Sequence, residues 1–428
     1  MKPFLQSILA LFFSVSLFAD ERPNIVLIIS DDHAWTDYTF MVHEKVRTPH
    51  IDRMAAEGLT FTRGYVTTAL CSPSLATMLT GLYPHQHGIT GNDPVRGLDR
   101  EEWLDRFFQN PILPKQLADA GYLTLHTGKY WMRKPADAGF TDDIGETGRH
   151  GGKSLSIGRQ GMDPIYKFID KAKAQEKPFF VWYAPFLPHT PHNPPARLLD
   201  KYKGVKNAKY YAMVEWLDET CGDLMKNLKD KGVDDNTLIV YLADNGWNSW
   251  GKASPYENGI RTPFILRWPA KIKPKQDTKR FASNLDVVPT ILTAAGVNVP
   301  CNNPGINLLD DSAVSSRKEL FFENFSHNMV SPTEPGKACG RVPSSVATGN
   351  SFLGRKTHPR NARMFRVTVA RTQRSSTNSS ISRKIPTKTR NSLVNIPTRP
   401  KNSRLRSTLG GNHEDWPSGI SLQAFRSI

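Results

Sequence analysis

Short apolar runs alternate with amphipathic stretches along most of the chain. Runs that are apolar throughout and rich in β-branched residues predict strands covered on both faces, and they occupy residues 24–30, 122–127, 179–184, 238–243 and 264–268. Between them, helical patterns cover 51–57, introduced by Thr48-Pro49, and 207–231. This alternation predicts an α/β fold with a mostly parallel central sheet flanked by helices.

Polar side chains directly follow two of these predicted strands. Asp31 and Asp32 come after the first strand, and Asp244 and Asn245 come after run 238–243. Ligands collect at the carboxyl ends of parallel strands, and carboxylates in an apolar crevice need a cation between them. Oxygen-only ligands favour a hard divalent ion such as Ca²⁺ or Mg²⁺ over zinc. The alternative is that both pairs are ordinary turns that close the strands.

Composition and charge narrow the class of protein. The 428 residues are 39% apolar and 10% aromatic, which supports one large or two medium domains and excludes a collagenous or wholly disordered chain. Four cysteines are too few for a disulfide framework. Residues 341–428 hold 17 of the Lys and Arg side chains against two acids, so the preceding 340 residues carry a net charge of only +1. Because the net charge of residues 1–340 is close to zero, the sequence predicts no nucleic-acid partner.

The two ends of the chain differ from the body. Lys2, the apolar run 4–18 and Ala19 predict a signal peptide over residues 1–19, with a buried hydrophobic start as the alternative. The run is short for a membrane span and none follows, so we expect an exported protein, periplasmic or secreted. Residues 339–428 are rich in Ser, Thr, Asn and Arg and predict no regular elements. A disordered basic tail, a truncated relative and a reading-frame error remain open, and residues 20–338 form the expected catalytic domain.

A signature at residues 71–81, Cys-Ser-Pro-Ser-Leu-Ala-Thr-Met-Leu-Thr-Gly, resembles the active-site motif of the type I, formylglycine-dependent sulfatases of the alkaline phosphatase superfamily. Further segments follow that family's order, and together they span roughly residues 22–300: Arg-Pro-Asn-Ile-Val at 22–26, Thr-Pro-His-Ile-Asp at 48–52, Thr-Gly-Lys at 127–129, Pro-His-Thr-Pro at 188–191, Asp-Asn-Gly at 244–246 and Tyr-Glu-Asn-Gly-Ile-Arg-Thr-Pro at 256–263. Such a combination is far more specific than any one motif.

The resemblance implies an alkaline-phosphatase-like fold and a metal-dependent sulfuric ester hydrolase acting on sulfated carbohydrates. It implies that a formylglycine-generating enzyme oxidises Cys71, whose hydrated aldehyde supplies the nucleophile. Ser72-Pro73 reads independently as a helix start, which would place Cys71 at the positive end of a helix dipole. The implied metal ligands are Asp31, Asp32, Asp244 and Asn245, and the implied substrate-binding residues are Lys129, Lys252 and, at the leaving group, His189.

The sequence departs from the family pattern at three places. Leu75 stands where arginine is usual, and Trp131 stands where a histidine is usual. The C-terminal subdomain is atypical or missing. Histidines 33, 126 and 192 are candidates to replace the missing imidazole, and His85, His87 and Asn92 either line the approach to the site or hold a loop. Two other functions stay open, a phosphomonoesterase or phosphodiesterase of the same superfamily and a non-catalytic glycan-binding protein.

Overall fold

The computed structural model describes residues 22–145, 156–248, 251–331 and 334, and the backbone of 147–148, 151–152 and 364–368. The expected signal peptide and most of the expected tail lie outside the described residues. Across the part that is described, no helix combines the length and the apolarity that a bilayer crossing requires.

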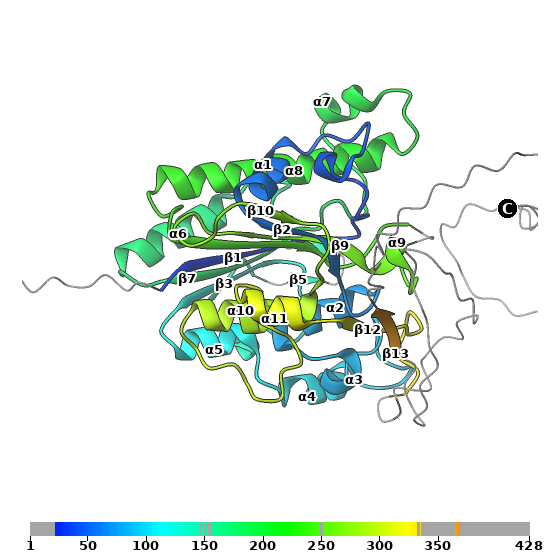
Figure 1. The fold of residues 1–428 in the computed structure, drawn as a ribbon. Helices are drawn as coiled ribbons and strands as arrows, with labels where there is room; N and C mark the ends of the chain where they lie inside the picture. The colour runs from blue at the N-terminus through cyan, green and yellow to red at the C-terminus, as the bar shows by residue number, and fades with distance from the viewer. Residues whose placement is uncertain are drawn as a thin grey trace, which may run out of the picture. The chain divides into compact units, whose positions relative to one another are not determined.

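A nine-stranded sheet forms the centre of the fold, in the order β10-β2-β9-β8-β1-β7-β3-β4 with β11 beside β2 (Figure 1). All its pairings are parallel except those of β9, which runs antiparallel to β2 and β8. The strands are β1 Asn24–Ser30, β2 Leu59–Tyr65, β3 Leu123–Gly128, β4 Asp142–Asp143, β7 Phe179–Ala184, β8 Thr237–Ala243, β9 Arg261–Arg267, β10 Lys275–Asp277 and β11 Ala282–Ser283. A mostly parallel α/β sheet is therefore confirmed.

Helices cover both faces of this sheet, so its central strands are buried on both sides (Figure 1). Alternate residues of β1 enter opposite cores: Leu27 packs in the cluster with α2 and α10, and Val26 packs in the one with α1 and α8. The helices are α1 Pro49–Glu57, α2 Cys71–Thr80, α3 Pro84–His87, α4 Arg100–Phe108, α5 Leu113–Asp119, α6 Asp163–Ala174, α7 Ala196–Leu199, α8 Ala208–Asp230, α9 Glu257–Ile260, α10 Val287–Ala294 and α11 Asp311–Ser316.

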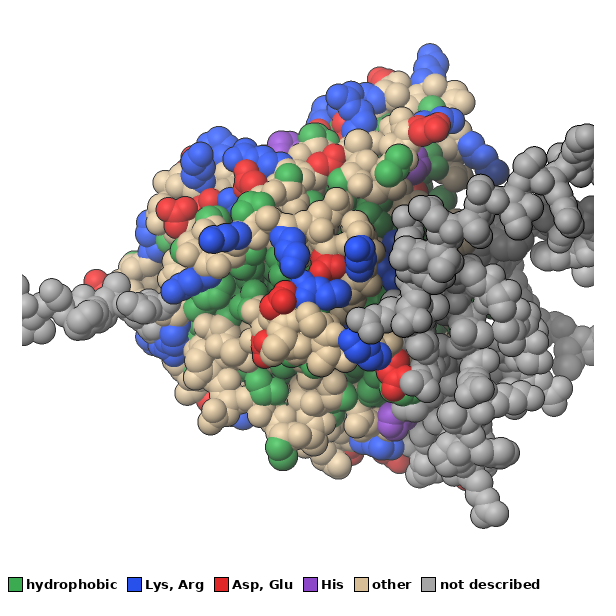
Figure 2. Space-filling view, in the orientation of Figure 1, with side chains coloured by type: hydrophobic (Ala, Val, Ile, Leu, Met, Phe, Trp, Pro, Cys, Tyr) green, Lys and Arg blue, Asp and Glu red, His purple; other side chains and the backbone are tan. Residues whose placement is uncertain are grey.

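The distribution of surface charges agrees with the nearly neutral net charge of the first 340 residues. On the face shown in Figure 2, Lys and Arg side chains are interspersed with Asp and Glu side chains. Several charged side chains elsewhere in the described structure pair directly, as Arg133 does with Glu101 at 2.6 Å and Arg197 with Glu219 at 2.6 Å.

The structure departs from the expected elements at two places. Strand β2 was not expected, because Arg63 and its threonines interrupt the apolar pattern, yet it pairs with β9 and β10 inside the sheet. The expectation of no regular element after Cys339 is wrong at one place: β13, Met364–Thr368, pairs antiparallel with β12, Glu319–Glu323. The alternation of apolar and polar residues in Met-Phe-Arg-Val-Thr suits such an edge pairing.

A buried carboxylate on α8 holds the N-terminus of α1. Asp218 accepts hydrogen bonds from the backbone N–H groups of Ile51 at 2.7 Å and His50 at 3.2 Å. These amides have no partner within the helix itself, so Asp218 performs the capping that the Thr48 side chain does not. Burial raises the pKa of Asp218 to about 7, against the opposing effect of the two hydrogen bonds.

The raised pKa of Asp218 gives a pH-dependent stability difference between the wild type and Asp218→Asn. Between the unfolded and folded pKa values the folded carboxyl keeps a proton that the unfolded chain has lost, so raising the pH weakens the wild type. Relative to the variant, wild-type stability is expected to fall by about 2–3 kcal/mol from pH 5 to pH 8. Urea denaturation at several pH values measures this, with exposed Asp119→Asn as the control. A difference that does not change with pH would contradict the prediction.

Candidate active site

An acid cluster lies at the carboxyl edge of the sheet. Strands β1 and β8 are parallel neighbours with Ser30 opposite Ala243, so the residues that follow them emerge together. The ligand atoms of Asp31, Asp32, Asp244 and Cys71 all lie within 4.8 Å of one another, and all four residues are buried. The backbone N–H of Asp32 donates to Asp244 Oδ1 at 3.0 Å, which fixes the two segments against each other.

Cys71 is the first residue of α2, and its Sγ lies 3.6 Å from Asp32 Oδ1. The expected N-cap at Ser72 is therefore wrong by two residues. Leu70 occupies the N-cap without a side-chain hydrogen bond, and the free N–H of Ser72 donates instead to Asn92 Oδ1 at 3.0 Å. A distant amide thus performs the capping, and Cys71 faces the acid cluster from the first helical turn.

Two ammonium groups and an imidazole complete the cluster. Lys129, directly after β3, pairs through Nζ with Asp31 and lies 3.2 Å from Asp244 Oδ2. Lys252 Nζ contacts both oxygens of Asp32, at 2.9 and 2.8 Å. His189 Nε2 lies 3.5 Å from Asp32 Oδ2. All the residues that the sequence singled out as the site therefore converge, including Asn245, whose Nδ2 donates to Asp32 Oδ1 at 2.6 Å.

Burial and charge act in opposite directions on these carboxyl groups. Burial raises the pKa of Asp244 to about 7, although Lys129 acts to lower it, and burial raises the pKa of Asp31 in the same way. Burial also acts to raise the pKa of Asp32, but Lys252, His189 and Lys129 outweigh it and hold that pKa below its usual value. Asp244 therefore retains its proton up to near neutral pH, whereas Asp32 is ionised there.

The donor set fits a hard divalent cation. Asp31 Oδ2 and Asn245 Oδ1 are buried acceptors without a hydrogen-bond partner among the described residues. Leaving such oxygens unpaired in the interior costs free energy that a cation would recover. Three carboxylates and an amide oxygen are the ligand types that Ca²⁺ and Mg²⁺ prefer.

Arg159 holds the segment that carries His189. Its guanidinium donates to the carbonyl oxygens of Phe186, of His189 at 3.1 Å and of Pro191 at 3.1 Å, and to the side chain of Asn193. The imidazole itself is oriented by a bond between Nδ1 and the Thr190 carbonyl oxygen, at 2.7 Å. Sequence reasoning missed Arg159, since it belongs to no motif and its partners lie some 30 residues away.

We expect Arg159→Met to lower kcat for an aryl sulfate by about 10²-fold with little change in KM, because a displaced His189 no longer meets the reacting atoms. Arg159→Lys should restore part of the loss, since an ammonium can still donate to two of the carbonyl oxygens. Steady-state kinetics on both variants measure this. Arg133→Met, which removes a surface guanidinium paired with Glu101, serves as the control. Equal kinetics in the Arg159 and Arg133 variants would refute the positioning role.

Trp131 contacts the site through Lys129. The Lys129 ammonium lies 4.9 Å from the centroid of the Trp131 ring and 5.7 Å from that of Phe186. Each ring face offers the ammonium a cation–π contact, which supplements its carboxylate partners. Trp131, which stands where the family has a histidine, therefore packs its ring against the Lys129 ammonium and supplies no base.

The three candidate replacement histidines have other surroundings. His126 lies in the core, with ring centroids of Tyr130 and Phe140 at 4.9 and 5.3 Å, and burial lowers its pKa to about 3. His33 is buried against Tyr38 at 4.1 Å, with Nε2 bonded to a backbone carbonyl oxygen. His192 lies 6.3 Å from the ring of Trp247. None of their imidazole rings has a described hydrogen bond with Cys71 or with a carboxylate of the acid cluster.

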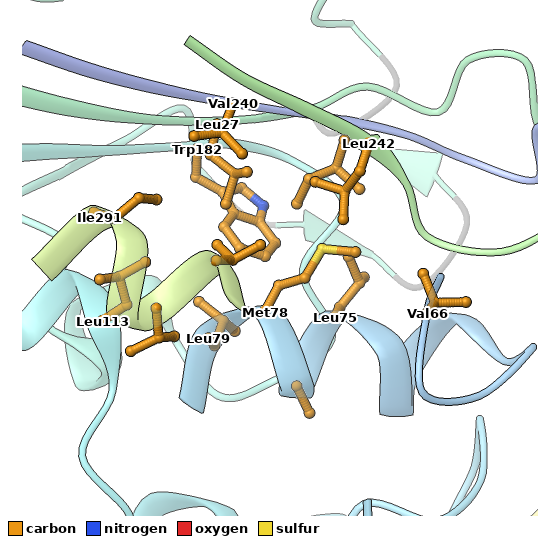
Figure 3. Packing of buried hydrophobic residues seen from close by; sticks show 14 of the residues in the cluster. Leu27, Val66, Leu75, Met78, Leu79, Leu113, Trp182, Val240, Leu242 and Ile291 are labelled. Atoms are coloured by element: carbon orange, nitrogen blue, oxygen red, sulfur yellow. The ribbon is translucent and has the colours of Figure 1, made fainter. Parts of the chain in front are cut away.

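The histidines past the signature hold a loop rather than line the approach. His87 is buried, with Nε2 3.2 Å from Thr77 Oγ1, and His85 pairs with the buried Glu323. Leu75, in place of arginine, packs in the hydrophobic cluster between α2 and the sheet, together with residues such as Met78 and Leu242 (Figure 3). Cys221 is buried within α8 and belongs to the core of that face of the sheet.

A mostly parallel sheet with a buried acid cluster at its carboxyl edge places the protein among the α/β proteins whose ligand site lies at the carboxyl ends of the strands. The chain belongs to the sulfatase family, since the Sulfatase family model matches residues 23–297. It is 28% identical over 355 residues to human N-acetylgalactosamine-6-sulfatase, covering 68% of this chain and 66% of that protein. With human arylsulfatase A the identity is 29% over 381 residues, or 73% of each chain.

Solved structures support the same assignment. The crystal structure of Ps i-CgsB superposes with a TM-score of 0.63 at 26% identity, over 71% of this chain and 80% of that chain. The fold is therefore the alkaline-phosphatase-like fold of the sulfatases. The chain spans about two thirds of the length of the N-acetylgalactosamine-6-sulfatases that it matches.

Proposed function

We propose that this chain is an exported, metal-dependent sulfuric ester hydrolase that acts on sulfated carbohydrates through a formylglycine formed from Cys71. The observation that carries the proposal is the convergence of Cys71, three buried carboxylates and two ammonium groups at one edge of the sheet. A cluster that combines ammonium groups, carboxylates and a precursor of a nucleophile suits a sulfate ester. The ester's oxygens need positive charge beside them, and its sulfur needs a nucleophile.

Asp31, Asp32, Asp244 and Asn245 would hold the divalent cation, Ca²⁺ in preference to Mg²⁺. When bound, that cation supplies Lewis-acid polarisation of a sulfate oxygen and favours the deprotonated nucleophile. The oxidised Cys71 supplies a hydroxyl nucleophile where the thiol now lies. Lys129 and Lys252, which pair with the acids, would turn toward the sulfate oxygens once a cation satisfies the carboxylates.

His189 is suited to proton transfer at the leaving alkoxide. Because Nδ1–H donates to the Thr190 carbonyl oxygen, Nε2 is the atom that faces the cluster. Burial, with help from Lys129 and Lys252, lowers the pKa of His189 to about 4. A sulfate bound beside both lysines would offset their charge and raise the pKa of the imidazole, so that Nε2 could carry the proton that the alkoxide needs.

The names of similar proteins support a carbohydrate substrate. They include N-acetylgalactosamine-6-sulfatase, an ulvan-active sulfatase of Formosa agariphila at 28% identity, and Ps i-CgsB solved in complex with k-i-k-neocarrahexaose. Each of these names refers to a carbohydrate. Export would bring the enzyme to such polysaccharides.

The test is peptide mass spectrometry across Cys71 on protein exported by its native host, combined with turnover of 4-nitrophenyl sulfate and 4-nitrophenyl phosphate. We expect the aldehyde in place of the thiol, and sulfate hydrolysis that a chelator abolishes and Ca²⁺ restores. Faster phosphate hydrolysis would favour the phosphoesterase alternative. Unmodified cysteine without turnover of either ester would favour the non-catalytic alternative.

A further inference from the structure

An open hollow lies beside the acid cluster. Its volume is about 180 Å³, which is smaller than the about 300–1,000 Å³ of pockets for whole drug-sized ligands and leaves room for one unit of a larger ligand. Ala34, Thr36 and Asp37 contribute walls from the segment after β1, and Trp247 and Asn248 contribute walls from the segment after β8. The two segments that bear the cluster's acids therefore also build this hollow, although none of the residues assigned to the cation or the sulfate lines it.

The hollow is tied to the cluster by the backbone. The N–H of His33 donates to the carbonyl oxygen of Asn245 at 3.0 Å, which joins the two wall segments. The N–H of Lys252 donates to the carbonyl oxygen of Asn248 at 2.9 Å. A ligand in the hollow would consequently lie at a fixed position relative to the lysine that pairs with Asp32.

A supported aromatic ring forms one wall. Trp247 stacks on Tyr210 with ring centroids 3.6 Å apart and an interplanar angle of 6°. The Tyr210 hydroxyl accepts a hydrogen bond from the Ala34 N–H at 3.2 Å, which fixes the stack against the segment after β1. Trp247 itself is only partly buried, so it offers aromatic surface to the hollow at little cost in side-chain entropy.

The remaining walls are formed by Tyr211 and by polar side chains that include one carboxylate. Asn207, Asn248 and Asn258 contribute amide groups, and Thr36 contributes a hydroxyl. Asp37 is the charged group, and its Oδ1 lies 2.9 Å from the Thr36 hydroxyl and 3.5 Å from His43 Nε2. Among the described lining residues there is neither lysine nor arginine. An anionic group here would face Asp37 without a cation to pair with, whereas hydroxyl groups would find donors and acceptors.

We propose that this hollow is a subsite for an unsulfated, uncharged sugar unit next to the sulfated unit of the substrate, with the ring of Trp247 as its stacking surface. The proposal rests on the proposed function and adds the neighbouring residue of the substrate to it. The cluster holds the sulfate group, and the hollow selects the oligosaccharide that carries this group.

The first test compares Trp247→Ala with the wild type on 4-nitrophenyl sulfate and on a panel of sulfated galactobioses. The panel contains isomers sulfated on one ring and isomers sulfated on both. We expect the variant to lose about 10-fold or more in kcat/KM on the monosulfated disaccharides, mainly through KM, and less than 2-fold on the aryl ester, which does not reach the hollow. The wild type should prefer the monosulfated to the doubly sulfated isomers. Trp247→Phe should retain most disaccharide activity, and Tyr166→Ala on α6 is the control for losing a partly buried aromatic ring.

The second test does not depend on turnover. Saturation-transfer NMR with unsulfated galactobiose, chitobiose and cellobiose should show binding to the wild type for at least one disaccharide, and loss of that signal in Trp247→Ala but not in Tyr166→Ala. Equal signals in all three proteins, or no signal in the wild type, would overturn the subsite. Absence of sulfatase activity together with a Trp247-dependent signal would overturn the proposed function and leave the subsite standing.

Discussion

Cys71→Ala is expected to lower the turnover of 4-nitrophenyl sulfate by about 10⁴-fold or more, the largest effect of any single substitution in this chain. The thiol is the one nucleophilic precursor beside the acid cluster in the described structure, with Sγ 3.6 Å from Asp32 Oδ1. Alanine has no atom that the modifying enzyme could oxidise and none that could attack sulfur. The remaining groups would bind the ester without opening a path for its hydrolysis.

The fold should survive that substitution. Burial raises the pKa of Cys71 well above its usual value, so the unmodified side chain is a neutral thiol whose loss removes one sulfur from a packed site. The cost in stability is expected to be about 1 kcal/mol. Cys221→Ala is the matched control, because Cys221 is equally buried, within α8. Single-turnover kinetics and thermal melting on both variants measure the prediction, and Cys71→Ala activity within 10-fold of the control would refute it.

Asp244→Asn is expected to lower kcat by about 10³-fold, corresponding to about 4 kcal/mol of lost cation-dependent stabilisation. The variant keeps the shape of the side chain, including the oxygen that accepts from the Asp32 N–H at 3.0 Å. It removes one of the three carboxylates that would hold the cation. Lys129 would keep Asp31 as its partner.

The same substitution should not weaken the cation-free protein above neutral pH. Burial raises the pKa of Asp244 to about 7, so its ionised form is costly above that pH, and an amide avoids the cost. A cation must displace the proton held by Asp244, and the rise in melting temperature on adding Ca²⁺ should therefore grow from pH 6 to pH 8. Asp244→Asn should lose most of that rise.

Differential scanning fluorimetry with and without Ca²⁺ measures these shifts, alongside kinetics on 4-nitrophenyl sulfate. Asp218→Asn is the matched control, since Asp218 is also a buried carboxyl whose pKa burial raises to about 7, but it caps α1 instead of facing the cluster. It should retain both the Ca²⁺ response and the activity. Loss of the Ca²⁺ response in Asp218→Asn alone would contradict this account of the cluster.

Local sequence patterns predicted the strands and helices whose periodicity is visible within one segment. Run 24–30 became β1 and run 179–184 became β7 with unchanged limits, and the helix expected over 207–231 is α8, Ala208–Asp230. Strand β2 was not predicted, because its polar residues interrupt the apolar pattern of a buried strand. Its place in the sheet depends on pairing with β9 and β10. Helix α2 begins at Cys71 instead of after Ser72, and Asn92, twenty residues from Ser72, accepts the hydrogen bond of the Ser72 N–H.

By itself the sequence determined the class of fold and the identity of the cluster residues. Strand periodicity and the sulfatase motifs can each be recognised within a short segment, and the residues that follow a predicted strand are known from the sequence as well. Only the tertiary structure decided what surrounds that cluster. The order of the sheet puts β8 beside β1 and so brings Asp244 to Asp32. The same packing places Arg159 under the His189 segment and Trp247 against Tyr210. Those contacts join residues that no spacing relates, and they form only when the helices and loops close over the sheet.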